Sequence, residues 1–186
     1  MDKAFRNAAF PKACRIMGFN LKPMTLGHVF LLRQFDCVLL DNQEPTLGEL
    51  LLSCFICSDT WKNSASNITK WWVPIIFKLV GWKCRRLNLS DEIDSFFVYL
   101  KDSFAMPTFN RDSKSMPKEL GAPFEYVLLV TLMTQLGMSM SDALSCQLTF
   151  ANCLELTLAD MKGSVFLETD SQRAFYDFAR NNRVTN

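Results

Sequence analysis

The chain contains a single histidine, His28, so any mechanism that needs an imidazole base would depend on that residue. His28 follows Thr25 by three residues, and Thr25 is a suitable N-cap for a helix from about residue 26 to residue 35. In the first turn of such a helix the dipole lowers the pKa of an imidazole. This position favours a hydrogen-bonding role at the surface over a role as a base.

Cys54 and Cys57 form a CxxC pair, a spacing that can bind zinc or carry thiol redox chemistry. A zinc site needs four ligands, and Cys84 and His28 would have to complete it from distant segments. The pair continues an apolar helical run, in which free cysteine packs as a small hydrophobic residue. We therefore expect core packing, with no bound metal and no cofactor. A cysteine-based metal-binding regulator is the alternative.

Other catalytic motifs are missing from the sequence. It has no glycine-rich phosphate loop, no nucleophile elbow and no HExxH, and it contains only seven glycines. The neighbouring carboxylates of Asp91, Glu92 and Asp94 fall on what the pattern indicates is a solvated helix face. The sequence therefore predicts a protein that is not an enzyme.

Basic residues gather around Trp82, namely Lys78, Lys83, Arg85 and Arg86. Such a patch can contact phosphate or an acidic membrane surface, or it can simply be the cationic C-terminal end of a helix. A peripheral membrane protein that uses Trp71, Trp72 and Trp82 with these cations is therefore one alternative. The chain as a whole has 20 basic and 19 acidic residues, which gives no electrostatic case for nucleic-acid binding.

The composition is that of a folded domain. The chain has 186 residues, 49% of them hydrophobic, which suits one domain with a substantial core. Seven irregularly spaced cysteines and the lack of an apolar leader predict reduced thiols and a cytoplasmic location. We expect no transmembrane segment, since no apolar run approaches the roughly 20 residues that a bilayer needs.

Helical periodicity dominates the N-terminal half. Between residues 91 and 104 the apolar side chains recur at helical spacing, behind Ser90 as the expected N-cap: Ile93, Phe96, Phe97, Leu100 and Phe104. Thr46 and Glu49 have the spacing of a capping box and precede an apolar run. Both segments are therefore predicted helices.

In the C-terminal half, residues 124–136 are apolar nearly all round, which is typical of a helix at the centre of a bundle, with Gly137 as its stop. Further helix is expected at residues 143–161, ended by Gly163, and at residues 171–180. The sequence thus predicts an all-α fold, a compact bundle of about six to eight helices. We expect a larger N-terminal half (1–103), an exposed loop (104–122) and a C-terminal hairpin with a short helix (123–186), all sharing one core.

The predicted loop is the candidate partner-binding element. A long structureless connection inside a domain tends to be functional. This one contains or adjoins residue types that are enriched at interfaces: Phe104, Met106, Phe109, Arg111 and Lys114. These side chains either dock a partner or fold back on the core.

Two stretches resemble small tail-region proteins of tailed bacteriophages: Leu21–His28 followed by Val29–Leu32, and Gly121–Tyr126 followed by Gly137–Ser139 and Asp142–Leu144. The resemblance implies a helical assembly factor of the tail-chaperone kind, which holds an aggregation-prone partner, or a small virion component. It brings no catalytic or ligand residues. We therefore expect a non-enzymatic assembly factor that binds a protein partner, with a structural subunit of a virion or other large particle as the alternative.

Overall fold

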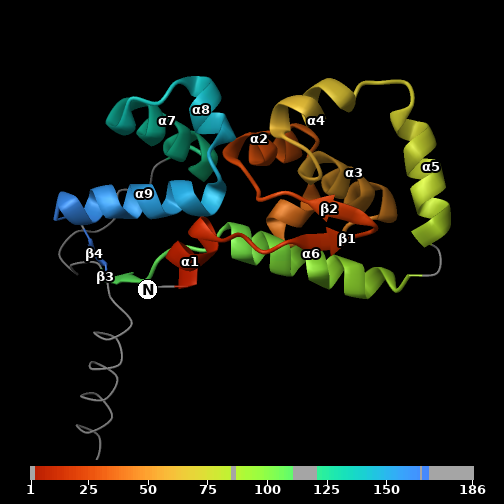
Figure 1. Cartoon of the computed structure of the whole chain (residues 1–186), viewed down its shortest axis with the longest axis horizontal. Coiled ribbons are helices and arrows are strands. Elements are labelled where there is room, and N and C mark those ends of the chain that lie inside the picture. The colour runs from red at the N-terminus through yellow and green to blue at the C-terminus, as the bar shows by residue number, and fades with distance from the viewer. Residues whose placement is uncertain (1–2, 85–86, 111–120, 164, 168–186) are drawn as a thin grey trace, which may run out of the picture.

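The structure, a computed structural model, describes residues 3–84, 87–110, 121–163 and 165–167. Within these ranges the predicted, predominantly helical fold is confirmed, although it has more helices than expected and some short strands (Figure 1). The helices are α1 (Lys3–Ala9), α2 (Leu26–Gln34), the 3-10 helix η1 (Val38–Asp41), α3 (Leu47–Cys57), α4 (Trp61–Asn67), α5 (Val73–Cys84), α6 (Leu89–Ser103), α7 (Phe124–Leu136), α8 (Met140–Ser145) and α9 (Leu148–Met161). The strands form two antiparallel pairs: β1 (Cys14–Ile16) with β2 (Phe19–Leu21), and β3 (Phe109–Asn110) with β4 (Phe166–Leu167).

Helix α2 lies at the centre of the molecule and joins its two halves. It packs against α3 and α4 on the N-terminal side and against α7 and α8 on the C-terminal side (Figure 1). Two main-chain hydrogen bonds reinforce this junction, from Leu26 N to Cys146 O (3.1 Å) and from Leu148 N to Met24 O (2.8 Å). The buried apolar residues from Ile16 to Ala151 accordingly form one continuous cluster.

The hairpin of β1 and β2 was not predicted from the sequence. Its two-residue turn, Met17 and Gly18, has positive φ at both positions, which matches the twist of a tight hairpin. Ile16 and Leu21 are buried, and the Met17 amide donates to the Glu92 carboxylate at 2.6 Å. The hairpin therefore packs between α3 and α6 instead of lying free at the surface.

The helix starts follow local capping chemistry. At α3 the predicted capping box between Thr46 and Glu49 is present in both directions. At α6 the predicted N-cap Ser90 is wrong: Asn88 caps the helix, and its side chain accepts a hydrogen bond from the Ser90 amide. An asparagine oxygen caps a helix as well as a serine hydroxyl, so the helix begins slightly earlier than expected.

The C-terminal half contains two differences from the prediction. The expected helix over residues 143–161 is broken at Cys146 and Gln147, where extended backbone lets Cys146 accept the bond from Leu26. Helix α7 ends at Gly137 as predicted, but it is not central: it packs on α2, α8 and α9 and leaves one apolar side exposed. The helix predicted at residues 171–180 lies outside the described residues. In the described part of the chain, no helix is long and apolar enough to cross a bilayer.

Candidate partner-binding groove

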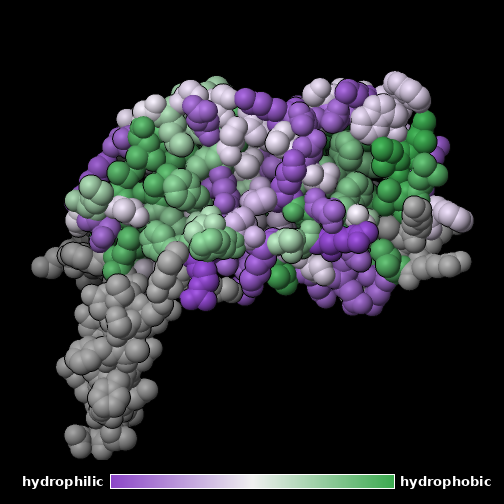
Figure 2. All heavy atoms as spheres, in the orientation of Figure 1, coloured by the Kyte–Doolittle hydropathy of each residue, from purple (hydrophilic) through white to green (hydrophobic). Residues whose placement is uncertain are grey.

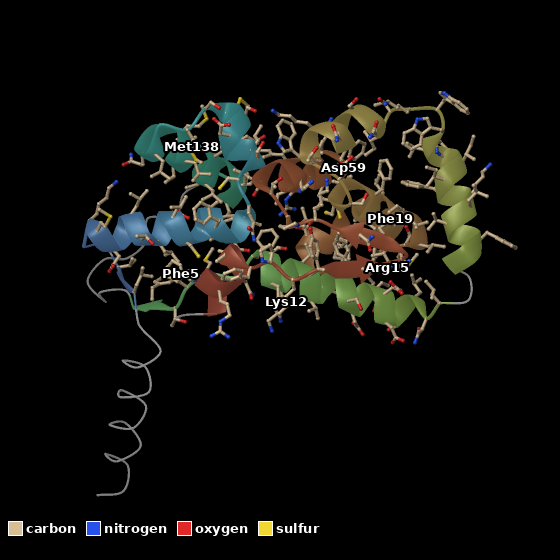
Figure 3. The ribbon with its side chains drawn as sticks, in the orientation of Figure 1. Phe5, Lys12, Arg15, Phe19, Asp59 and Met138 are labelled. Carbon is tan, nitrogen blue, oxygen red and sulfur yellow. The ribbon has the colours of Figure 1, made fainter. Side chains whose placement is uncertain are left out.

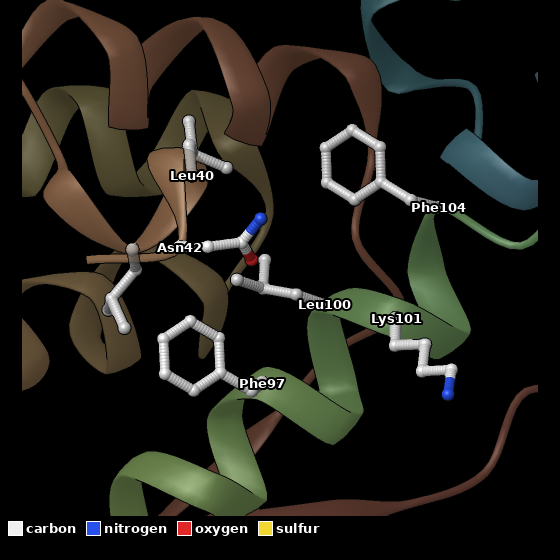
Figure 4. A pocket seen from close by; sticks show the side chains of 7 residues that line it. Leu40, Asn42, Phe97, Leu100, Lys101 and Phe104 are labelled. Carbon is white, nitrogen blue, oxygen red and sulfur yellow. The ribbon is translucent and has the colours of Figure 1, made fainter. Parts of the chain in front are cut away.

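A groove lies between η1 and α6 and has a volume of about 560 Å³. Its walls are formed by Leu39, Leu40, Asn42, Phe97, Leu100, Lys101 and Phe104. Figure 4 shows the Asn42 amide between the Phe97 and Phe104 rings, while the Lys101 ammonium group points outward at the rim. The groove is thus apolar, with one amide inside it and one cation at its edge.

The periodicity of α6 explains how this wall is built. Phe97, Leu100 and Phe104 are separated by three and four residues, which places them on neighbouring turns of one helix face. Phe96 and Leu100 are buried, whereas Phe97 and Phe104 are only half-buried. The apolar face of α6 therefore contributes both to the core and to the wall of an open groove.

The opposite wall depends on a tight turn at the end of η1. Asn42 has φ 55° and ψ 31°, a left-handed conformation that asparagine tolerates better than most residues with a Cβ. The main-chain N–H of Asn42 donates to the carbonyl oxygens of Leu39 and Val38. This turn keeps Leu39 and Leu40 opposite α6, with Leu39 fully buried and Leu40 half-buried.

The lining chemistry suits apolar contacts. The seven lining residues supply aliphatic and aromatic side chains, one amide and one amine. Half-buried aromatic and aliphatic side chains are groups that can hold the apolar anchors of a partner. A single rim cation adds a preference for an acidic neighbour.

The predicted partner-binding residues are only partly brought together. Phe104 lines the groove, but it also packs partly against the core. It is half-buried, whereas the sequence predicted that it lies in an exposed loop. Met106 is exposed just beyond α6, and Phe109 is half-buried in β3, where it pairs with Leu167. Arg111 and Lys114 lie outside the described residues. The groove residue Phe97 was missed because its place in the apolar stripe predicted core packing.

His28 is buried, which corrects the predicted surface role. Its side chain is 1% exposed beneath α4, and its Nε2 donates to the main-chain oxygen of Asp59 at 2.8 Å (Figure 3 labels Asp59). Its Nδ1 accepts from the Thr25 amide at 3.0 Å. Burial lowers the pKa of His28, and nearby Lys22 lowers it further, against the opposing effect of Asp59. Both ring nitrogens are therefore engaged within the fold.

Cys54 and Cys57 lie in the core, as the core-packing interpretation predicted. Burial raises the pKa of Cys57 to about 12, so its thiol is protonated at neutral pH. The side chain of Cys84 lies outside the described part of the structure. Among the described side chains, no three His, Cys, Asp or Glu residues are grouped as a metal site would require.

The chain matches no protein-family model, no curated protein and no solved structure. The resemblance to phage tail-region proteins therefore stays a prediction. The two stretches that carry it adjoin each other in space, because Leu21–His28 leads into α2 and Gly121–Tyr126 leads into α7, which packs on α2. Phe30 and Tyr126 meet edge to face across this contact, with ring centroids 4.9 Å apart.

Two further apolar surfaces lie at opposite ends of the molecule. Figure 2 shows one over α5 and the other over the corner formed by α7, α8 and α9. The second surface is made by Tyr126, Val130, Met133, Leu136, Met140 and Phe150. Exposed apolar surface of this kind is typical of proteins that bind other macromolecules.

Proposed function

We propose that the protein is a non-enzymatic assembly factor that holds an apolar helical segment of a protein partner in the groove between η1 and α6. The observation that carries the proposal is the open, aromatic-walled groove itself, with Phe97 and Phe104 on one wall and Leu40 on the other. Together with the phage-tail resemblance, this groove supports a role like that of a tail assembly chaperone, acting in the host cytoplasm.

The size and chemistry of the groove fit such a segment. Its volume of about 560 Å³ lies within the range of roughly 300–1,000 Å³ that is typical of ligand pockets. An amphipathic partner helix would place two or three apolar anchors, spaced by one helical turn, against Phe97, Leu100 and Phe104. An acidic residue next to those anchors would reach Lys101 at the rim.

Site-specific photo-crosslinking in native host extract tests the proposal. A photoreactive phenylalanine analogue at Lys101 lies at the groove, whereas the same analogue at Val98 is exposed on another side of α6. We expect a single partner protein to crosslink at position 101 and not at position 98. Lys101→Glu should also weaken capture of that partner about threefold to tenfold, because it reverses the rim charge.

The predicted loop is the competing docking element. Deleting residues 106–118 should leave partner capture intact if the groove binds the segment, since Phe97 and Lys101 remain in place. If the deletion abolishes capture while crosslinking at position 101 is absent, the loop is the site and the groove proposal is wrong.

The alternative role is that of a structural subunit. The protein composition of purified mature particles distinguishes it from an assembly factor. An assembly factor is released, so the purified particle should contain far less of the chain than of its partner. A fixed ratio of the chain to its partner in the mature particle would favour the structural subunit.

A further inference from the structure

The tryptophans and a net positive charge are concentrated in one segment of the sequence. All four tryptophans lie between residues 61 and 82. Residues 60–90 contain six of the twenty basic residues and none of the nineteen acidic ones. The rest of the chain therefore has fourteen basic and nineteen acidic residues, a formal charge of −5 against +6 for this segment. The chain is close to neutral overall but strongly polarised along its length.

Helix α5 lies within this segment at one edge of the molecule (Figure 1). Its inner side packs on α3, where Phe55 meets Trp72 and Phe77 edge to face, with ring centroids 6.2 Å and 5.7 Å apart. Val73, the first residue of α5, is buried. These contacts attach one side of α5 to α3.

An apolar stripe of four exposed residues follows the outer side of α5 and the turn that precedes it. Ile75, Leu79 and Trp82 recur at intervals of four and three, so they lie on one face of α5, and Trp71 lies in the turn two residues before the helix begins. Trp71 is 80% exposed and Trp82 is 69% exposed. In sequence order Trp71 and Trp82 are the first and last residues of the stripe, with the aliphatic pair Ile75 and Leu79 between them. We refer to these four residues as the α5 stripe.

Two exposed lysines lie next to residues of the α5 stripe in the sequence. Lys70 is exposed next to Trp71, and Lys78 is exposed between Ile75 and Leu79. No acidic side chain occurs between Asp59, before α4, and Asp91, in the first turn of α6. Helix α5 therefore combines an apolar face with positive charge that no acidic residue within the segment offsets.

We propose that the α5 stripe binds the surface of a membrane rich in anionic lipid, with α5 lying in the plane of that surface. Trp71 and Trp82 supply amphipathic rings that favour the headgroup boundary, and Ile75 and Leu79 enter the acyl region between them. Lys70 and Lys78 reach lipid phosphates. The charge of −5 on the rest of the chain turns the remainder of the molecule away from the membrane.

A hollow beside the α5 stripe adds to the argument. It has a volume of about 530 Å³ between α3 and α5 and is lined by Leu47, Gly48, Leu51, Phe77, Lys78, Gly81 and Trp82. Its lining is apolar apart from Lys78. An acyl chain therefore finds apolar contacts there, with a cation at the edge for its phosphate. An acidic protein partner could pair with the same lysines. It would not provide the boundary between headgroups and acyl chains that the two exposed indole rings favour.

Flotation with vesicles tests the proposal with the full chain. The probes are vesicles of phosphatidylcholine alone and vesicles of phosphatidylcholine and phosphatidylserine in equal amounts, at low and at high salt. We expect binding to the anionic vesicles only, weakening as salt screens the lysines. Trp71→Ser with Trp82→Ser should reduce binding about tenfold or more, since the stripe loses both anchors. Lys70→Glu with Lys78→Glu should reduce it about tenfold or more.

Matched controls use exposed residues at other places on the molecule. Tyr126→Ser with Phe150→Ser removes two exposed aromatic rings from the opposite end, and Lys12→Glu with Lys162→Glu reverses two exposed charges. Both control variants should float like the parent chain. Circular dichroism of all four variants shows whether each remains folded.

Three results would overturn the membrane proposal. They are no binding to the anionic vesicles at low salt, equal binding to neutral vesicles, and equal losses in the α5 and control variants. Loss of a co-purifying acidic protein in the Trp71 and Trp82 variant, without any vesicle binding by the parent, would assign the α5 stripe to a protein partner instead. None of these outcomes bears on crosslinking at Lys101 in the groove.

Discussion

At the scale of single residues, His28 shows how one side chain links the start of α2 to the connection before α4. Its Nδ1 accepts from the Thr25 amide at the start of α2, and its Nε2 donates to the Asp59 oxygen before α4. These two bonds require the neutral ring with its proton on Nε2. A charged ring would break the first bond, because both nitrogens of an imidazolium are donors.

This arrangement predicts a dependence of stability on pH. The pKa of His28 is lowered in the folded protein, chiefly by burial, so the unfolded chain takes up the proton first as the pH falls. The free energy of unfolding should therefore decrease as the pH drops below the unfolded value of 6.5, until the folded form also protonates. Urea unfolding followed by circular dichroism between pH 5.5 and pH 7.5 measures this slope.

His28→Gln provides the comparison. Glutamine makes only one of the two bonds, so we expect it to lower the free energy of unfolding by about 1–3 kcal/mol at neutral pH. It should also flatten the slope below pH 6.5. Glu155, whose pKa is raised by burial, contributes with the opposite sign, and Glu155→Gln removes that contribution. A slope unchanged in His28→Gln would rule out His28 as its source.

At the scale of elements, α2 and α3 begin with the same three residues. Thr-Leu-Gly occupies the N-cap and the first two helical positions in both, followed by His28 in α2 and Glu49 in α3. Each fourth residue completes a capping box with its threonine. Gly27 and Gly48 therefore occupy equivalent positions in two local structures of the same kind.

The surroundings of these glycines differ, which predicts opposite effects of one substitution. A Cβ at Gly27 would lie 2.5 Å from Cγ of Trp61, whereas a Cβ at Gly48 would meet only Thr46 Oγ1 at 3.9 Å. Gly27→Ala should lower the free energy of unfolding by about 1–3 kcal/mol through overpacking. Gly48→Ala should raise it by about 0.4–1 kcal/mol, because alanine restricts the unfolded chain. Urea unfolding of both variants measures the difference, and changes of the same sign would contradict it.

The same elements show what the sequence could predict. Helix ends that depend on neighbouring residues, such as the Thr46 capping box and the stop at Gly137, were predicted correctly. The β1–β2 hairpin was missed because Met17 is a weak signal for a left-handed turn. The exposed side of α7 and the groove beside Phe97 were also missed, since periodicity marks a residue as apolar without showing what covers it.

At the scale of the whole molecule, the two halves on either side of residues 104–122 are joined by many kinds of contact. Arg33 Nε lies 3.4 Å from the nearly buried Glu125 carboxylate, and Thr149 Oγ1 donates to the Ser103 oxygen at 2.9 Å. The apolar cluster is continuous across the same boundary. Neither half has a complete core of its own, because α2 is covered from both sides.

Cutting the chain should therefore not separate its halves. With a protease recognition sequence inserted in residues 111–120 and then cleaved, we expect both fragments to co-elute in gel filtration under native conditions. They should also unfold together in a single urea transition, because α2 holds α3 and α4 on one side and α7 and α8 on the other. The fragment that ends at the cut, produced alone, should lack this transition, since it exposes the apolar residues of α2 that α7 and α8 bury. Two separate transitions, or fragments that part without denaturant, would mean that the halves are independent domains.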